Sequence, residues 1–196
     1  LIAYTVTRHG LAVLLPLGKL ILTAFIATLI FVCITYLPII KLIGMKISDY
    51  LKGAFEPWLI AFTTCSSAAA LAVNLEASRK MGASKAIASF AIPLGNTINM
   101  NGTSIYMGVT AVFAAEVFGI DLTLAQQFQI VLMGVLAAVG TAGVPGAGLI
   151  MTTLVFTEVG IPLEAVALIA GIDRILDMIR TSVNVLGDSL TALVVS

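Results

Sequence analysis

Long stretches without any charged residue are the feature that most constrains how this chain folds. The first, Ile21–Ile40, has the ~20 apolar residues that a helix needs to cross a bilayer, and it extends upstream through Leu11–Leu20 with Lys19 as the one charge. Of the 196 residues, 60% are hydrophobic and 10% are charged, whereas soluble domains average ~25% charged residues. We therefore expect an all-α membrane protein, because no segment shows the alternation of a strand.

Three further uncharged runs carry small, polar or helix-breaking residues near their middle. The runs are Pro57–Leu75, Ala86–Ala115 and Leu122–Thr157, with interruptions at Thr63–Ser67, Pro93–Gly102 and Gly140–Gly148. Non-helical backbone at membrane depth is tolerated only where it is buried in protein or lines a cavity. Paired, interrupted apolar segments point to a transporter binding site near the midplane. We therefore interpret the first and third runs as re-entrant helical hairpins and the second as a broken helix.

The distribution of basic residues predicts the orientation of the chain. Lys and Arg flank both ends of the first hairpin, at Lys41, Lys46, Lys52, Arg79, Lys80 and Lys85. Residues 116–127 and 158–164 contain none, so the positive-inside rule places the first hairpin on the cytoplasmic side and the second on the outside. The expected order is the tail of a helix to His9, a spanning helix 13–43, hairpin one 50–80, broken helix 85–118, hairpin two 124–159 and a last helix 163–195.

The last helix carries an unusual polar stripe. At 100° per residue its members fall within about 80° of arc; they are Asp173, Asp177, Arg180, Asn184 and Asp188. Charges inside a spanning segment cost ~2.5–3.5 kcal/mol each, so they usually face a cavity or one another. One alternative is an internal Asp–Arg salt bridge that holds helices together. The mixture of acids, an arginine and an amide over several turns favours a substrate or ion path instead.

The residue types on this stripe suggest a ligand. The guanidinium of Arg180 matches a carboxylate with two parallel N–H donors, and Asp177, one turn earlier, suits an ammonium group. Together they favour a zwitterion with an acidic side chain. Backbone amides at Ser66–Ser67 and Gly146–Gly148 suit a second carboxylate.

A sodium site is predicted next to this ligand. Carbonyls of the broken helix around Gly95–Asn99, together with Asn184 and the carboxylate of Asp188, supply the hard oxygen ligands that a bare alkali ion prefers. Arg174 lies off the stripe and is assigned to helix packing or to the interface.

Other functions have little support in the sequence. Ten basic and ten acidic residues give no net charge, which argues against nucleic-acid binding. Cys65 has no nearby base, His9 is read as a solvated loop residue, and Gly140–Gly148 lacks the Lys-Ser/Thr of a phosphate loop. We therefore expect no enzyme and no organic cofactor. A channel is disfavoured because two closing hairpins occlude a path rather than line a pore.

Three motifs carry a resemblance to a known family. Asn99–Thr103 (Asn-Met-Asn-Gly-Thr), Gly140–Gly148 and Asp177–Asp188 resemble the signatures of the glutamate transporter family, the dicarboxylate/amino acid:cation symporters. The resemblance covers essentially the whole chain in order. It implies an elevator mechanism, in which a transport domain slides against a trimerising scaffold domain. Residues 1–12 then correspond to the end of a scaffold helix and 13–196 to the transport domain, within the C-terminal half of a homotrimeric, multi-pass cell-membrane protein.

The resemblance also implies site residues. The substrate contacts are Ser66, Ser67, Thr103, Val144, Gly148, Asp177, Arg180, Thr181 and Asn184, with Asp177 on the amino group and Arg180 on the side-chain carboxylate. One sodium site comprises Gly95, Asn99, Asn184 and Asp188. A second, mostly of carbonyls, comprises Thr97, Ala138, Val139 and Thr141.

The sequence departs from the family pattern at several positions. Asn101 stands where many members carry Asp as an internal sodium ligand, so we expect fewer coupled sodium ions, or a proton in place of one. Cys65 and Met178 occupy the two positions at which members carry a second arginine. Met107 after Tyr106 argues against the proton and potassium coupling of animal carriers. The expected function is sodium-coupled import of aspartate or glutamate. The alternatives are a proton-coupled, neutral amino acid or C4-dicarboxylate carrier of the same family.

Overall fold

The computed structural model describes residues 14–196, and every regular element in this range is a helix, as predicted. The expected helix end at 1–12, with His9, lies outside the described residues. The elements are α2 (Leu14–Phe31), η2 (Val32–Tyr36), α3 (Leu37–Leu42), α4 (Ile47–Thr64), α5 (Ser67–Lys80), α6 (Lys85–Ile98), α7 (Asn101–Val117), α8 (Leu124–Val139), α9 (Ala147–Val159), α10 (Glu164–Ala170) and α11 (Asp173–Val195).

The first three elements form one long helix with a π-helical turn in its middle. The stretch Leu15–Leu42 is the one helix within 14–196 that is long and apolar enough to cross a membrane by itself. The π turn, η2, ends two residues before Pro38, which has no N–H to continue an α-helical ladder. Tyr36, at the end of the turn, is buried and donates its hydroxyl to the carbonyl of Val183 on α11.

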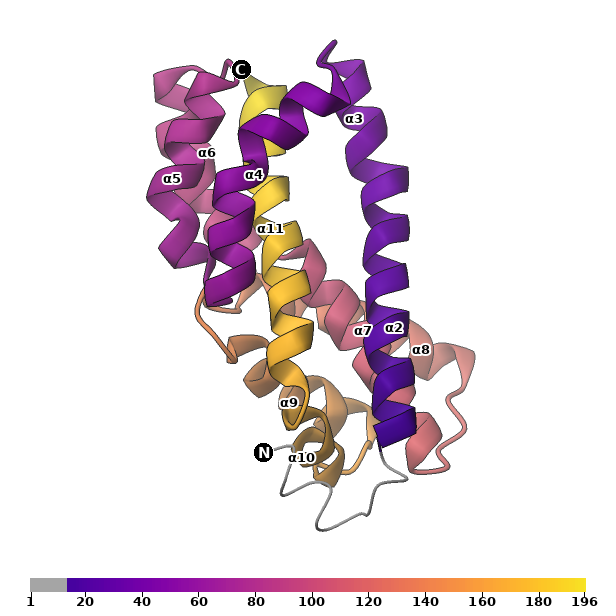
Figure 1. The fold of residues 1–196 in the computed structure, drawn as a ribbon. Helices are drawn as coiled ribbons and strands as arrows, with labels where there is room; N and C mark the ends of the chain where they lie inside the picture. The colour runs from indigo at the N-terminus through magenta and orange to yellow at the C-terminus, as the bar shows by residue number, and fades with distance from the viewer. Residues whose placement is uncertain (1–13) are drawn as a thin grey trace.

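Two helix pairs meet at their connections. α4 ends at Thr64 and is followed by Cys65, which adopts a left-handed conformation with φ of 56°. α5 begins after Ser66, whose hydroxyl caps the amide of Ala69. α8 and α9 are joined by residues 140–146. Ser66 Oγ donates to the carbonyl of Gly143 at 2.9 Å, so the two connections are in contact. The pairs lie toward opposite ends of the molecule in Figure 1.

α6 and α7 are separated by two non-helical residues, Asn99 and Met100. α7 crosses α11 closely at its start, because a Cβ on Gly102 would overlap the backbone of Arg180. This close crossing requires glycine and sets the side chains that follow it, including Thr103, against the polar stripe of α11.

α11 runs through the middle of the molecule, in contact with α2, α4, α5, α6 and α7 (Figure 1). The predicted last helix 163–195 was wrong in one respect, because the structure divides it into α10 and α11 at Gly171 and Ile172. Glycine weakens a helix by ~1 kcal/mol relative to alanine. Ile172 leaves helical geometry with ψ of 0°. The division makes Asp173 the first residue of α11, where a carboxylate interacts favourably with the helix dipole.

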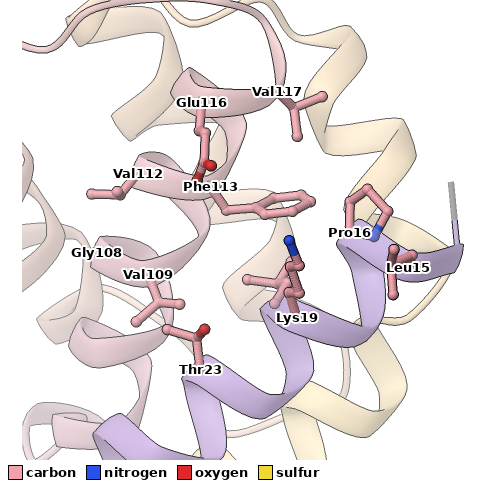
Figure 2. Close-up of a pocket in the computed structure, with 11 residues that line it drawn as sticks. Leu15, Pro16, Lys19, Thr23, Gly108, Val109, Val112, Phe113, Glu116 and Val117 are labelled. Atoms are coloured by element: carbon pink, nitrogen blue, oxygen red, sulfur yellow. The ribbon is translucent and has the colours of Figure 1, made fainter.

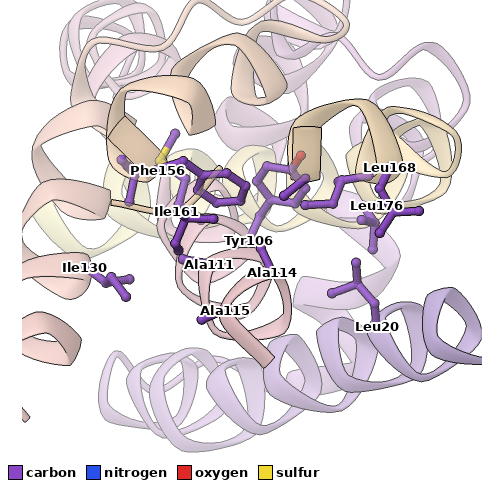
Figure 3. Packing of buried hydrophobic residues seen from close by; sticks show 14 of the residues in the cluster. Leu20, Tyr106, Ala111, Ala114, Ala115, Ile130, Phe156, Ile161, Leu168 and Leu176 are labelled. Atoms are coloured by element: carbon purple, nitrogen blue, oxygen red, sulfur yellow. The ribbon is translucent and has the colours of Figure 1, made fainter. Parts of the chain in front are cut away.

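The main hydrophobic core lies between α2, α7, α8, α9, α10 and α11. Figure 3 shows Tyr106, Phe156 and Leu176 packed together in it, with Leu20 approaching from α2. Burying a large apolar side chain contributes ~1.5–3 kcal/mol. This core therefore fixes α7 against α11, and Tyr106 brings a hydroxyl to its polar edge.

Candidate functional site

A buried arginine forms the centre of the candidate site. Arg180 is 4% exposed, its Nε lies 3.0 Å from Asp177 Oδ1, and its Nη1 lies 3.5 Å from Asp173 Oδ1. The guanidinium stacks 4.5 Å from the centre of the Tyr106 ring, and the Tyr106 hydroxyl donates to Asp173 Oδ1 at 2.8 Å. Both ion pairs join residues of α11, so they do not hold one helix to another. The salt-bridge alternative for the stripe therefore loses its support.

One edge of this guanidinium is left for a ligand. Arg180 Nη1 is buried, and apart from its 3.5 Å ion pair with Asp173 it makes no hydrogen bond among residues 14–196. Gly148 lies directly against it, since a Cβ there would overlap the guanidinium. An unsatisfied buried donor costs ~1–3 kcal/mol, more when charged, so an incoming carboxylate oxygen would gain that energy back.

The side chains around Arg180 form a small, tightly closed pocket. Its free volume is about 10 Å³, roughly the space of one water molecule. All predicted substrate residues except Ser66 line it. The lining consists of Ser67, Met100, Thr103, Thr141, Ala142, Gly143, Val144, Gly148, Asp177, Arg180, Thr181 and Asn184.

Asp177 on α11 holds the segment that joins α8 to α9. Its Oδ2 accepts the backbone N–H of Gly146 at 2.9 Å, and its Oδ1 accepts the hydroxyl of Thr181 at 2.8 Å as well as Arg180 Nε. The carboxylate thus already holds three donors. A ligand ammonium would therefore replace one of them. We expect it to replace the Gly146 N–H, because Gly146 lies in the glycine-rich connection, whereas the other two donors lie on α11 itself.

Asn184 joins the start of α7 to the same stripe. Its Nδ2 donates to Thr103 Oγ1 at 3.1 Å and contacts Met100 Sδ at 3.1 Å, while its Oδ1 accepts the N–H of Gly102 at 2.8 Å. Thr103 is 1% exposed. The structure therefore brings the Asn-Met-Asn-Gly-Thr motif onto the same face as Arg180.

The residues predicted for the first sodium site also converge. Asn99 Nδ2 donates to Asp188 Oδ1 at 2.8 Å and to the carbonyl of Asn184 at 3.2 Å. Gly95 lies against Asp188, because a Cβ on Gly95 would reach Asp188 Oδ1 at 2.5 Å. Asp188 is 2% exposed and has no cationic partner among the described residues. A buried carboxylate without a cation is a chemically suitable place for a sodium ion.

The residues predicted for the second sodium site are less closely connected. Thr97 is exposed and Thr141 is buried, and each hydroxyl donates to a carbonyl of its own segment, at 2.8 and 2.9 Å. Ala138 is buried whereas Val139 is 47% exposed. α6 and α8 are in contact, but no hydrogen bond in the described part of the chain joins Thr97 to the other three residues.

Sequence reasoning missed three contributors to the site. Tyr106 stacks on Arg180, Met100 contacts Asn184, and Asp173, although placed on the stripe, was not expected to pair with Arg180. A signal existed for Tyr106, because it follows Thr103 by three residues and so shares its helix face. Asp173 and Arg180 are seven residues apart, two helical turns, which also places them on one face.

Arg174 and Cys65 lie beside the site. Arg174 Nη2 donates to the carbonyls of Thr63 and Thr64 at the end of α4, at 3.3 and 3.2 Å, as its assignment to helix packing predicts. Such a contact satisfies carbonyls that have no partner within the helix. Cys65 Sγ lies 3.8 Å from the Arg174 carbonyl, and within residues 14–196 the hydrogen-bond partners of the thiol are backbone carbonyls.

A larger groove lies away from these residues. It occupies about 580 Å³ between α2 and α7, and Figure 2 shows Lys19 and Phe113 pointing into it. None of the predicted substrate or sodium residues lines it. The groove with the larger volume is therefore not the place where the predicted site residues and the buried charges gather.

Comparison with known proteins decides the family. The sequence model of the "Sodium:dicarboxylate symporter family" matches residues 1–196. The chain belongs to this family. Relatives of this sodium:dicarboxylate symporter chain include the "Proton/sodium-glutamate symport protein" of Geobacillus stearothermophilus, 38% identical over the whole chain and 47% of the relative. The "Proton/glutamate-aspartate symporter" of Escherichia coli (strain K12) is 37% identical over the whole chain and 45% of the relative. The "C4-dicarboxylate transport protein" of Bacillus subtilis (strain 168) is 37% identical over 99% of the chain and 46% of the relative.

Membership in the sodium:dicarboxylate symporter family has direct consequences. It is a family of secondary transporters, so the chain is not an enzyme, and it implies a location in the membrane. The chain spans about half the length of the curated relatives it matches.

Proposed function

We propose that the protein imports an acidic amino acid, aspartate or glutamate, together with sodium. The observation that carries the proposal is the buried Arg180, whose Nη1 has no hydrogen-bond partner within 14–196 and whose neighbour in the pocket is Asp177. A guanidinium next to a carboxylate offers one group for each end of an amino acid that carries an acidic side chain.

In this proposal the residues of the site divide into three groups by the part of the substrate that they contact. Arg180 binds the side-chain carboxylate of the substrate and Asp177 binds its ammonium group. Ser66, Ser67, Val144 and Gly148 at the two connections, with Thr103, Thr181 and Asn184, hold the main-chain carboxylate and close around the ligand. The support is that all of this set except Ser66 lines one pocket around a buried cation, with residues from α5, α7, α9, α11 and the connection between α8 and α9.

Substrate entry requires a movement of the connection between α8 and α9. A free volume of about 10 Å³ is far too small for an amino acid. The connection is held to α11 through the contact of Gly146 with Asp177, and to α5 through Ala68 N–H and Ser66 on the Gly143 carbonyl. Replacing the Gly146 donor with the substrate ammonium would remove the contact of this connection with Asp177, so we assign the connection as the gate.

The proposal includes the membrane topology. Pairs α4–α5 and α8–α9 are re-entrant hairpins that enter from opposite sides, and α6–α7 is a helix broken at membrane depth. Residues 13–196 form a transport domain that moves by an elevator mechanism against a scaffold, to which residues 1–12 belong, in a homotrimeric multi-pass protein of the cell membrane. The support is that irregular backbone at Asn99, Met100 and the two connections adjoins buried polar groups, as it does in transporters.

Sodium binds in two places in this proposal. The first site comprises Gly95, Asn99, Asn184 and Asp188, supported by the buried carboxylate of Asp188. The second comprises Thr97, Ala138, Val139 and Thr141. A proton as coupling ion is the alternative, because the names of several relatives include the proton.

A C4-dicarboxylate is the second candidate substrate, since the relative from Bacillus subtilis is named for that class. Asp177 favours an amino acid, because its carboxylate attracts the ammonium group of the substrate. A dicarboxylate has no amino group to place there, so the negative charge of Asp177 repels it. Competition for labelled aspartate bound to the intact, purified protein separates the candidates. Unlabelled aspartate and glutamate should compete strongly and succinate and serine weakly. Stronger competition by succinate than by aspartate would contradict the proposal.

A further inference from the structure

A chain of side-chain amides connects α7 to the buried carboxylate of Asp188. Asn101 Nδ2 donates to Asn99 Oδ1 at 2.6 Å, and Asn99 Nδ2 donates to Asp188 Oδ1 at 2.8 Å. Asn101 Nδ2 also donates to the hydroxyl oxygen of Tyr36 at 3.1 Å, and that hydroxyl donates to the carbonyl of Val183 at 3.1 Å.

The two ends of this chain fix the direction of every hydrogen bond in it. The Val183 carbonyl only accepts, so the single hydrogen of Tyr36 is used there and the Tyr36 oxygen needs a donor. A carboxylate also accepts, so Asn99 presents its NH₂ to Asp188 and its oxygen to Asn101. Asn101 therefore faces two acceptors and supplies both of its N–H groups, which is the only amide orientation that leaves no pair of acceptors in contact.

We propose that the Asn101 amide takes the place of a cation. Its two N–H groups donate to the oxygens of Asn99 and Tyr36, so that no ion binds between these oxygens in this protein. The inference rests on the proposed function, because it concerns the ions that accompany the substrate. The donor set supports it. A cation at this position would meet N–H groups rather than oxygens, so the residues present do not fit one.

A carboxylate at position 101 would reverse this situation. Its oxygens would face Asn99 Oδ1 and the Tyr36 hydroxyl oxygen, whose single hydrogen is used at the Val183 carbonyl, so a bound cation would satisfy all of these oxygens together. A cavity of about 430 Å³ adjoins the cluster and is lined by Tyr36, Asn99, Asn101 and Gly187 among others. An ion therefore has a route to the position, and Asn101→Asp should create a sodium site.

Thermal unfolding in sodium chloride and in choline chloride at equal concentration tests this proposal in the intact, purified protein. Asn101→Asp should unfold at a lower temperature than wild type in choline. Sodium should raise its Tm by about 3–5 °C more than it raises that of wild type. The Hill slope of sodium-dependent aspartate binding should rise by about one. An unchanged sodium response in Asn101→Asp overturns the proposal.

Three further variants make the result specific. Asn74→Asp makes the same chemical change at a buried asparagine of α5, whose Nδ2 donates to the Val185 carbonyl, and it should lose stability equally in both salts. Tyr36→Phe combined with Asn101→Asp removes one oxygen and should lose most of the added sodium response; full retention contradicts the assigned ligands.

Asn101→Ala keeps the proposal testable if the carboxylate variant does not fold. It removes both donors and adds no charge, so it should lower the Tm in both salts, and sodium should raise its Tm no more than it raises that of wild type. If the alanine variant is as stable as wild type, the two hydrogen bonds of the Asn101 amide do not stabilise the cluster, and the proposal fails. These measurements do not require transport, so an absence of aspartate uptake in wild type would refute the proposed function without deciding the role of Asn101.

Discussion

Replacing Arg180 by cysteine removes the one cation of the pocket, and the structure allows the effect to be worked out. A charged hydrogen bond contributes ~1.5–3 kcal/mol, so the loss of a two-point contact with a substrate carboxylate costs at least ~2–3 kcal/mol. This corresponds to a reduction in affinity for aspartate of about 30- to 140-fold.

A second effect of the same substitution has to be separated from the first. Arg180 pairs with Asp177 at 3.0 Å and with Asp173 at 3.5 Å, and all three side chains are buried. Removing one partner of a buried ion pair typically costs ~3–5 kcal/mol of stability. We therefore expect Arg180→Cys alone to be unstable. Combining it with Asp173→Asn removes one unpaired charge and leaves an oxygen to accept the Tyr106 hydroxyl.

The assay is direct binding of labelled aspartate to purified wild type, Asp173→Asn and the double variant. Asp173→Asn keeps the guanidinium and should hold aspartate affinity within about five-fold of wild type. The double variant should bind aspartate about 30- to 140-fold more weakly than wild type, and serine should compete as well as before or better. Wild-type affinity for aspartate and glutamate in a folded double variant would refute the role of Arg180.

Three other substitutions and one control test the remaining groups of the pocket and the first sodium site. Asp177→Asn should weaken aspartate binding by at least ~10-fold, since only aspartate carries an ammonium, and should leave succinate competition unchanged or improved, since the repelling charge is gone; equal losses for both ligands would assign Asp177 to folding. Gly148→Ala places a methyl group against the Arg180 guanidinium and should reduce aspartate binding by at least ~10-fold. Gly140→Ala on the same connection meets its neighbours at an ordinary 3.7 Å and should bind normally, so equal losses in the two would contradict a local effect. Asp188→Asn should raise the sodium concentration for half-maximal aspartate binding by at least ~10-fold, and an unchanged sodium dependence would remove Asp188 from the ion site.

The sequence predicted the features that arise from local patterns. The polar stripe follows from helical periodicity alone, and the structure buries Asp177, Arg180, Asn184 and Asp188, although the neighbouring residues of α11 are buried as well. The connection at Cys65 and Ser66 was marked by hydroxyl residues, which cap helices better than they continue them. Glycine and proline likewise marked residues 140–146.

Other features depend on contacts that local patterns do not record. Gly171 lies in an apolar run, and a single glycine is tolerated in many helices. The sequence around it was therefore too weak a signal to predict the division between α10 and α11. Tyr36 precedes Asn101 by 65 residues, and nothing near it in sequence indicates that its hydroxyl joins the amide chain. The stacking of Tyr106 on Arg180 is a contact between helices, which becomes visible only once α7 is placed against α11.

Uptake of labelled aspartate into proteoliposomes containing the intact protein tests the central claim most directly. An inward sodium gradient should drive accumulation above equilibrium, and replacing external sodium with choline at constant pH should abolish it. Unlabelled glutamate should compete, whereas serine should not. Accumulation that is equal in sodium and choline, or that follows a proton gradient alone, would contradict a sodium-coupled carrier of acidic amino acids.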